Sequence, residues 1–145
     1  MIALIQRVLK ADVRIAGETT ASIQGGLLAL IGVRPADTEK DARRLIERVL
    51  QYRVFDDSSG RMNLSLADVH GGLLLVPQFT LAADTRKGTR PGFSTAAPPD
   101  LARRLFDLAV DEAQSCHPAV ARGVFGADMQ VSLINDGPVT IWLES

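Results

Sequence analysis

The chain has 145 residues, of which 46% are hydrophobic and 23% charged, and its formal net charge is −1. This length is typical of one domain with one hydrophobic core, and no repeat or linker divides residues 1–145. No apolar run approaches the roughly 20 residues of a membrane span, so we expect no membrane contact. One cysteine and two histidines allow neither an internal disulfide nor a sizeable metal cluster, which favours a metal-free protein of the reducing cytosol.

The near-neutral charge gives the chain no global attraction to nucleic acid, and we expect no DNA partner. Contact with RNA would have to be local, through a basic cluster such as Arg86, Lys87 and Arg90. The first residues lack the basic start, the long apolar stretch and the cleavage site of a signal peptide. We therefore expect a cytoplasmic location.

The first third of the chain predicts several strands followed by a helix. Apolar patterns predict strands at 1–8, 12–16, 19–23 and 27–33. The last of these is continuously apolar, which is typical of a central strand covered on both faces. A helix is predicted at 38–51, because apolar residues recur there at helical spacing and charged residues occupy the other face, as on a solvated helix. Thr38 and Asp41 form an approximate capping box at its start.

The middle of the chain alternates strands with loops. Strands are predicted at 52–55 and 62–66, around a loop that contains an acidic pair. A buried strand at 73–76 continues into Pro77–Leu81, where polar Gln78 and Thr80 follow an apolar run. Without partners their burial would cost about 1–3 kcal/mol each, so they either close a hydrogen-bond network or face a ligand.

A long loop and a second helix follow. Residues 82–98 form a loop of the length that is often functional in compact domains. The helix is predicted at 99–115 and ends near His117-Pro118. Cys116 and His117 are adjacent, but their side chains diverge at a helix end, so we expect no catalytic pair. His70, in a glycine-flanked turn, is predicted to be a surface residue.

The last two predicted strands, 129–134 and 139–144, alternate apolar and polar residues on either side of a turn at 135–140, which predicts a hairpin. Pro138 cannot donate to a ladder, so the tip must bulge or stand clear of the sheet. Gly137 and Pro138 present mostly carbonyl oxygen. A cis Gly-Pro bond would point two carbonyls the same way, but only about 5–6% of X-Pro bonds in folded proteins are cis, so local sequence favours trans.

Standard catalytic sets are absent from the sequence, including the G-x-S-x-G elbow, the phosphate-binding loop and zinc spacings. Thr80 remains as a candidate nucleophile, and it has no visible base. An enzyme with this sequence should act on a substrate that reacts easily or brings its own catalytic group. The protein would then supply positioning and backbone donors.

Six short motifs, in order along nearly the whole chain, resemble those of the D-aminoacyl-tRNA deacylase family. They are Gln6–Val8, Gly60–Ser65, Pro77–Leu81, Lys87–Pro91, Phe125–Met129 and Asn135–Thr140. The resemblance implies a cytosolic homodimer without metal or cofactor. It would hydrolyse the ester that links a D-amino acid, or glycine, to the 3′ end of tRNA. The implied fold is a single α/β domain over residues 1–145: a curled mixed sheet, the helices near 38–51 and 99–115, and a C-terminal hairpin.

The resemblance also implies roles for particular residues. Gly137 and Pro138, joined by a cis bond, would enter the other subunit's active site, where their carbonyls exclude an L side chain. Gln78, Phe79 and Thr80 would form the opposite, catalytic wall, with the N–H groups of Phe79 and Thr80 facing the oxyanion. The remaining substrate-site residues would be Arg7, which holds the tip, Met129 beside it, Phe93 and Phe125.

Two positions depart from the family pattern, and two other functions stay open. Pro77 and Gly92 stand where the family usually has Ser, so no hydroxyl role transfers to either. Water attack with help from the ribose 2′-hydroxyl is favoured over a covalent Thr80 intermediate. The alternatives are a Thr-nucleophile esterase or amidase of small substrates, and a non-catalytic module that binds tRNA ends.

Overall fold

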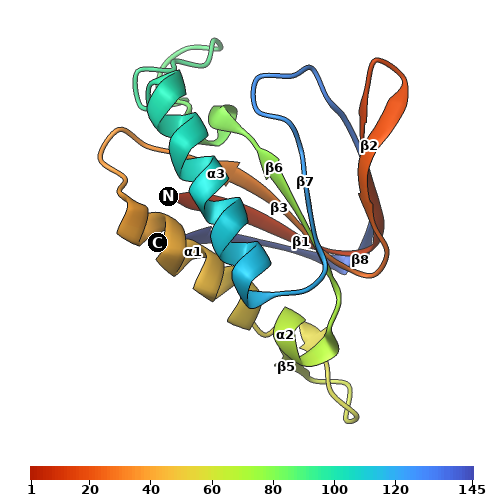
Figure 1. The fold of residues 1–145 in the computed structure, drawn as a ribbon. Helices are drawn as coiled ribbons and strands as arrows, with labels where there is room; N and C mark the ends of the chain where they lie inside the picture. The colour runs from red at the N-terminus through yellow and green to blue at the C-terminus, as the bar shows by residue number, and fades with distance from the viewer.

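A six-stranded mixed sheet organises the chain in a computed structural model that describes residues 1–145 (Figure 1). Its strands are β1 (Ile2–Ile15), β2 (Glu18–Ile23), β3 (Gly26–Gly32), β6 (Gly72–Pro77), β7 (Val120–Arg122) and β8 (Gln130–Glu144). A separate two-stranded ribbon pairs β4 (Phe55–Asp56) with β5 (Met62–Leu64). The helices are α1 (Glu39–Gln51), α2 (Leu66–Val69), the 3₁₀ helix η1 (Phe79–Ala82) and α3 (Pro99–Cys116). No helix is long and apolar enough to cross a bilayer.

The strand order is β2-β1-β3-β6-β7, and β8 pairs with β1. β3 lies at the centre, antiparallel to β1 and parallel to β6. Its apolar run is buried except at Leu30, which is partly exposed. The prediction of a central strand from a continuous apolar run is therefore confirmed.

The two faces of the sheet are covered differently. Helices α1 and α3 lie side by side on one face (Figure 1), where their apolar stripes form the larger core with residues such as Leu27 and Leu73. On the other face the sheet curls over itself, so that Val13 from the far half of β1 packs with Leu28 and Leu74. The predicted α/β domain with a curled mixed sheet and two main helices is confirmed.

β1 is one strand, so the prediction of separate strands at 1–8 and 12–16 was wrong. Its pairing with β8 shifts register between Gln6 and Val8 and again between Val8 and Lys10. Such irregularities bend a strand without ending its ladder. The bend of β1 therefore lies at residues 7–9, and residues 10–12 stay paired with β8 and form no turn.

Other boundaries differ where side chains cap the backbone. The predicted strand 62–66 ends at Leu64, because Ser65 and Asp68 form a capping box that starts α2, with the Ser65 N–H donating to Asp68 Oδ2 at 2.8 Å. The predicted strand 52–55 was wrong except at Phe55, where β4 begins. β7 was not predicted, because its three residues carry little periodic signal. The capping box of Thr38 and Asp41 at the start of α1 is confirmed.

Residues 130–144 form one strand, β8, whose two arms flank the predicted turn and pair with β1 rather than with each other. Both arms of β8 pair with β1: Thr140 lies opposite Gln6 and Asn135 opposite Val8. Residues 136–139 therefore stand opposite Arg7 alone and bulge out of the ladder. We refer to residues 136–139 as the Gly-Pro tip.

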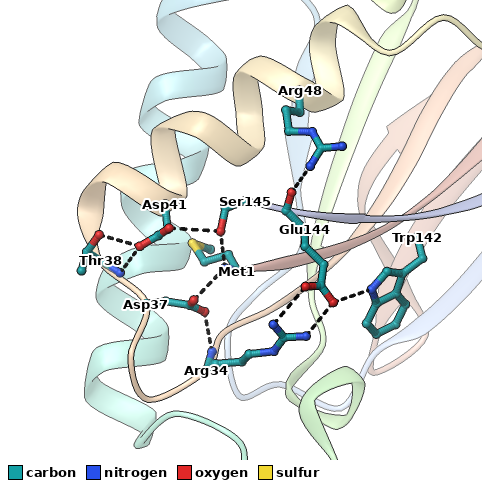
Figure 2. A network of polar contacts seen from close by, with 9 residues as sticks. All are labelled: Met1, Arg34, Asp37, Thr38, Asp41, Arg48, Trp142, Glu144 and Ser145. Atoms are coloured by element: carbon teal, nitrogen blue, oxygen red, sulfur yellow. Dashed lines mark hydrogen bonds and ion pairs between the residues drawn. The ribbon is translucent and has the colours of Figure 1, made fainter.

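A polar network fastens the end of β8 to the loop before α1 (Figure 2). The Glu144 carboxylate accepts from Arg34 Nη2 at 2.8 Å and from Trp142 Nε1 at 3.0 Å. The Met1 ammonium group donates to Asp37 Oδ1 at 2.7 Å in the same network. Hydrogen bonds from Arg34, which have the larger effect, and from Trp142 lower the pKa of Glu144 to about 2.

This shift predicts a small acid-dependent contribution to stability. A carboxylate whose pKa is lowered on folding stabilises the fold above its unfolded pKa of about 4.3, and the effect is lost as the pH falls toward 2. Because Glu144 is half exposed, we expect Glu144→Gln to lower the free energy of unfolding by less than about 1 kcal/mol at pH 7 and by nothing near pH 2. Urea denaturation at the two pH values measures this. Glu47→Gln, at an exposed carboxylate without an ion pair, is the control, and equal losses in the two variants would contradict the expectation.

Candidate active site

The predicted catalytic wall lies on a helical turn, not on a strand. β6 ends at Pro77, and the chain turns into η1 with Gln78 as its N-cap residue. The Gln78 N–H donates to Ile31 O at 2.7 Å, which fixes the start of the turn against β3. The prediction that strand 73–76 continues to Leu81 was therefore wrong. A proline cannot donate to the sheet ladder, and strands commonly end at one.

This turn leaves backbone donors at an exposed place. The first N–H groups of a helix have no partner within it, so those of Phe79 and Thr80 need acceptors from outside η1. Phe79 and Thr80 are both exposed. The Thr80 hydroxyl accepts a hydrogen bond from Gln78 Nε2. The segment Gln78–Thr80 therefore offers two N–H groups and one oriented hydroxyl.

An apolar cavity of about 520 Å³ adjoins this segment. Its lining includes Gln78, Phe79, Phe125 and Met129 from the predicted site, together with Pro77. Met129, which lines the cavity, packs closely against Gly123, since a Cβ on Gly123 would lie 2.9 Å from Met129 Sδ. The structure thus brings together residues that lie far apart in the sequence, such as Gln78 and Met129.

Phe93 does not line the cavity itself, but it packs against Phe79, which does. The two rings pack with their centroids 5.1 Å apart and their planes tilted by 53°. The backbone of neighbouring Gly92 exchanges two hydrogen bonds with Asp84, at 2.7 and 3.0 Å, and so closes the long loop at its base. Gly92 holds this loop by its backbone, and the departure from the family's usual Ser leaves that contact intact.

The Gly-Pro tip forms a second cluster, and none of its residues lines the cavity. The Gly137–Pro138 bond is cis, as the resemblance implied and contrary to the preference of the local sequence. The Val139 N–H donates to Asn135 Oδ1 at 2.7 Å across the base of the tip. Gly137 has a φ of +136°, and a Cβ there would lie 2.8 Å from Val139 Cγ2, so a larger residue does not fit without strain.

Arg7 joins the tip to the body of the domain. Its Nε donates to Asp136 O at 2.9 Å and its Nη1 to Val54 O at 2.6 Å. The side chain is 11% exposed, and it also lies 3.4 Å from the Asp136 carboxylate. One guanidinium group therefore ties two loops to β1. This position agrees with the expectation that Arg7 holds the tip.

On the other side of η1 a larger groove, of about 940 Å³, is lined by Thr80, Arg34, Arg86 and Trp142 among others. No sequence pattern connects Arg34 or Trp142 with the site. Trp142 alternates with apolar Ile141 and Leu143, a pattern that indicates an outward-facing ring, but nothing local tells what lies beside it. The groove exists only because β8 and the long loop meet at η1.

The other reactive side chains lie elsewhere. His117 is buried, with Nε2 2.6 Å from Gly71 O, and Cys116 is exposed at the end of α3. His70 caps the end of α2 at the surface. The prediction that these residues form no catalytic pair agrees with their positions. No group of three or more His, Cys, Asp or Glu side chains is placed to hold a metal ion.

Comparison with known proteins decides the family. Residues 4–144 match the family model described as D-Tyr-tRNA(Tyr) deacylase. The chain belongs to this family. It is 65% identical to the D-aminoacyl-tRNA deacylase of Thioalkalivibrio sulfidiphilus, over 99% of this chain and 97% of the relative. It is 60% identical to the protein of that name from Pseudomonas entomophila, over 99% of both chains.

Two solved structures share the fold of this family member. One, named c-Myc DNA Unwinding Element Binding Protein, has a TM-score of 0.96 and 37% identity, and the match covers 100% of this chain and 99% of that one. The other is described as a probable eukaryotic D-amino acid tRNA deacylase, with a TM-score of 0.89 over 99% and 98% of the two chains. At 14% identity the second supports the fold alone.

The position of Arg7 predicts how its removal affects the tip. We expect Arg7→Ala to lower the free energy of unfolding by about 1–3 kcal/mol, because two partly buried carbonyls are deprived of a charged donor. Hydrogen exchange of the Val139 N–H should also become faster. Arg14→Ala, on the same strand but 54% exposed, is the control and should change both quantities little. Equal exchange at Val139 in the two variants would show that Arg7 does not hold the tip.

Proposed function

We propose that this protein hydrolyses the ester between a D-amino acid, or glycine, and the 3′ end of tRNA, and that it does so in the cytoplasm without a metal or cofactor. The observation that carries the proposal is the match to the deacylase family over residues 4–144, together with the 65% identical relative of that name. The geometry agrees with it. Gln78 and Phe79 lie beside an apolar cavity, with exposed backbone donors at the start of η1.

These donors support a mechanism of hydrolysis. The N–H groups of Phe79 and Thr80 would stabilise the oxyanion that forms when water attacks the ester carbonyl. Positioning supplies the rest of the rate enhancement, because an aminoacyl ester is activated by its own ammonium group and the ribose 2′-hydroxyl can assist. The water proton leaves with the 3′-oxygen, so free tRNA and the amino acid are the products.

The alternative of a Thr80 nucleophile lacks structural support. A threonine hydroxyl needs an adjacent base to become a nucleophile. Thr80 Oγ1 accepts a hydrogen bond from the Gln78 amide, which cannot take a proton from it. No His, Asp or Glu contacts this hydroxyl. We therefore assign Thr80 to the wall of the site and not to a covalent intermediate.

The separation of the tip from the cavity supports an active site shared between subunits. In one chain Gly137 and Pro138 project from β8, and neither lines the cavity beside Phe79. We propose a homodimer in which the tip of each subunit enters the site of the other. Carbonyl oxygens at the α-carbon would clash with an L side chain, whereas a D side chain points away and glycine has none.

Chiral selectivity is the first prediction of this proposal. Wild-type protein should release amino acid from tRNA charged with D-tyrosine or with glycine and should spare L-tyrosyl-tRNA under matched conditions. Thr80→Ala should behave in the same way, because the mechanism does not use the hydroxyl as a nucleophile. Release of radiolabelled amino acid measures the rates.

Each other outcome identifies a different function. Loss of turnover in Thr80→Ala, together with cleavage of free amino-acid esters, would support the Thr-nucleophile hydrolase. Binding of all three charged tRNAs without release would support the non-catalytic module. Equal cleavage of the D and L esters would contradict the exclusion role of Gly137 and Pro138. Parallel assays with duplex DNA test the expectation that DNA is no partner.

Mixed dimers test whether the tip acts across the subunit interface. Gly137→Ala should displace the tip and permit hydrolysis of L-tyrosyl-tRNA. Phe79→Pro removes one N–H donor at a position that tolerates proline, and should lower kcat by about 10²–10³. Dimers are formed with a large excess of Phe79→Pro subunits. Each Gly137→Ala subunit then has a Phe79→Pro partner, whose intact tip enters the active wall of the Gly137→Ala subunit. The L-ester activity of that wall should therefore fall while its D-ester activity remains.

Phe79→Ala, which removes the ring but keeps the N–H, is the control for the inactive subunit. L-ester hydrolysis that stays constant per Gly137→Ala subunit, at any excess of the other variant, would mean that each tip serves its own chain. Light scattering of the wild type measures the dimer directly.

A further inference from the structure

The groove on the far side of η1 from the cavity has features of a nucleic-acid site. Thr80 belongs to its lining, whereas Gln78 and Phe79 line the cavity, so η1 forms a ridge between the two depressions. An ester held by the N–H groups of Phe79 and Thr80 would lie on this ridge. For a substrate larger than an aminoacyl nucleoside, the groove is the depression that adjoins the ridge on the side of Thr80.

Trp142 supplies an exposed ring on this groove. The side chain is 46% exposed, and it packs against no other aromatic ring. Its orientation is nevertheless fixed, because Nε1 donates to Glu144 Oε1 at 3.0 Å. Arg34 in turn holds the same carboxylate with two hydrogen bonds, at 2.8 and 3.2 Å (Figure 2). An apolar face that is exposed and held in place is a platform on which a planar ligand can stack.

Asp84, Thr85 and Arg86 line the groove, and the loop that continues from them carries further positive charge. Residues 84–92, which we call the cationic loop, contain Arg86, Lys87 and Arg90. Asp84 closes the loop by pairing with the Gly92 backbone, and it also binds the Arg86 guanidinium at 2.8 and 2.9 Å. Lys87 and Arg90 pair with no carboxylate. Two cations therefore remain free to meet phosphate groups.

We propose that this groove binds the single-stranded nucleotides that precede the terminal adenosine of tRNA, with one base stacked on Trp142 and the phosphates facing Lys87 and Arg90. The inference rests on the proposed function and adds a substrate subsite to it. A stacking platform together with a basic margin is the combination that binds single-stranded RNA without reading its sequence. Arg34 and Glu144 are positioning residues, because they act through Trp142.

Fluorescence gives a direct test, because Trp142 is the only tryptophan of the chain. Stacking of a base on the indole should quench its emission when the trinucleotide CpCpA is added to the intact wild-type protein. Adenosine alone should quench it much less. Glu144→Gln should weaken the response, because a neutral amide holds the Arg34 guanidinium and the indole N–H less firmly than a carboxylate does.

Kinetics with a long and a short substrate locate the effect. We expect Trp142→Ala to lower kcat/KM for D-tyrosyl-tRNA by about tenfold, the usual cost of removing one base–aromatic stack, and to leave kcat/KM for 3′-O-D-tyrosyl-adenosine unchanged. The ratio of the first value to the second should therefore fall about tenfold. Trp142→Phe, which keeps a ring, should restore most of the ratio. The change should appear in KM and leave selectivity for D over L esters intact.

The charges are tested by salt dependence with a matched control. Lys87→Gln with Arg90→Gln should reduce the slope of log(kcat/KM) against log salt by about 0.7 for each phosphate group that no longer faces a cation. Lys40→Gln with Arg44→Gln removes the same charge from the exposed face of α1 and should leave the slope unchanged. Equal slopes in the two double variants would contradict phosphate binding at the cationic loop.

The outcomes separate this inference from the proposed function. A wild type that hydrolyses neither substrate overturns the proposed function. A wild type that hydrolyses both, with an unchanged ratio in Trp142→Ala and no quenching by CpCpA, overturns the subsite alone. Emission that is already shielded without RNA, and becomes exposed on dilution, would mean that a second copy of the chain covers Trp142, and this too would overturn it.

Discussion

The pairing of both arms of β8 with β1 is the constraint on which the rest of this structure depends. An edge strand that follows a curled neighbour must either bend with it or leave the ladder. β8 does both, since its two arms stay paired and residues 136–139 leave the ladder opposite Arg7. The bulge is possible because Pro138 has no N–H to satisfy and Gly137 has no Cβ. The Gly-Pro tip is thus produced by the sheet and is not an appended loop.

The same strand pairing connects the tip to the stability of the whole domain. Arg7 lies on β1 within the sheet and donates to carbonyls of two loops that are far apart in sequence, at Val54 and Asp136. A charged donor shared by two carbonyls holds both more firmly than water could, because the guanidinium group is largely shielded. The geometry of the tip is therefore set by the core and by β1, and its own residues determine only what it presents.

Chemistry is concentrated where β6 ends. The strand is buried up to Val76, and the chain must leave the sheet at Pro77. The 3₁₀ turn that follows exposes N–H groups which a longer strand would have paired, and it divides the surface into an apolar cavity and a groove lined by Arg34, Arg86 and Trp142 among others. One short turn thereby places donors between two depressions with different linings. A substrate with an aminoacyl part and a polynucleotide part is divided in the same way, with the aminoacyl part matched to the cavity and the polynucleotide to the groove.

Much of this protein was determined by its sequence alone. Strand β3, the helices α1 and α3, the capping box at Thr38 and the presence of a turn at 135–140 follow from local periodicity and side-chain chemistry, which act between residues close in sequence. The motifs around Gln78 and Pro138 also indicated the family. Local patterns failed where a distant neighbour decides the outcome: β1 continues through Lys10 because β8 pairs with it. The start of α2 at Ser65 is different, because its capping box with Asp68 is local and a sequence pattern could have indicated it. Only the tertiary structure placed Met129 beside Phe79, separated the tip from the cavity, and brought Trp142 to the groove that Thr80 shares. Those contacts join residues from opposite ends of the chain, and their free energy comes from packing the complete sheet, which no local sequence pattern encodes.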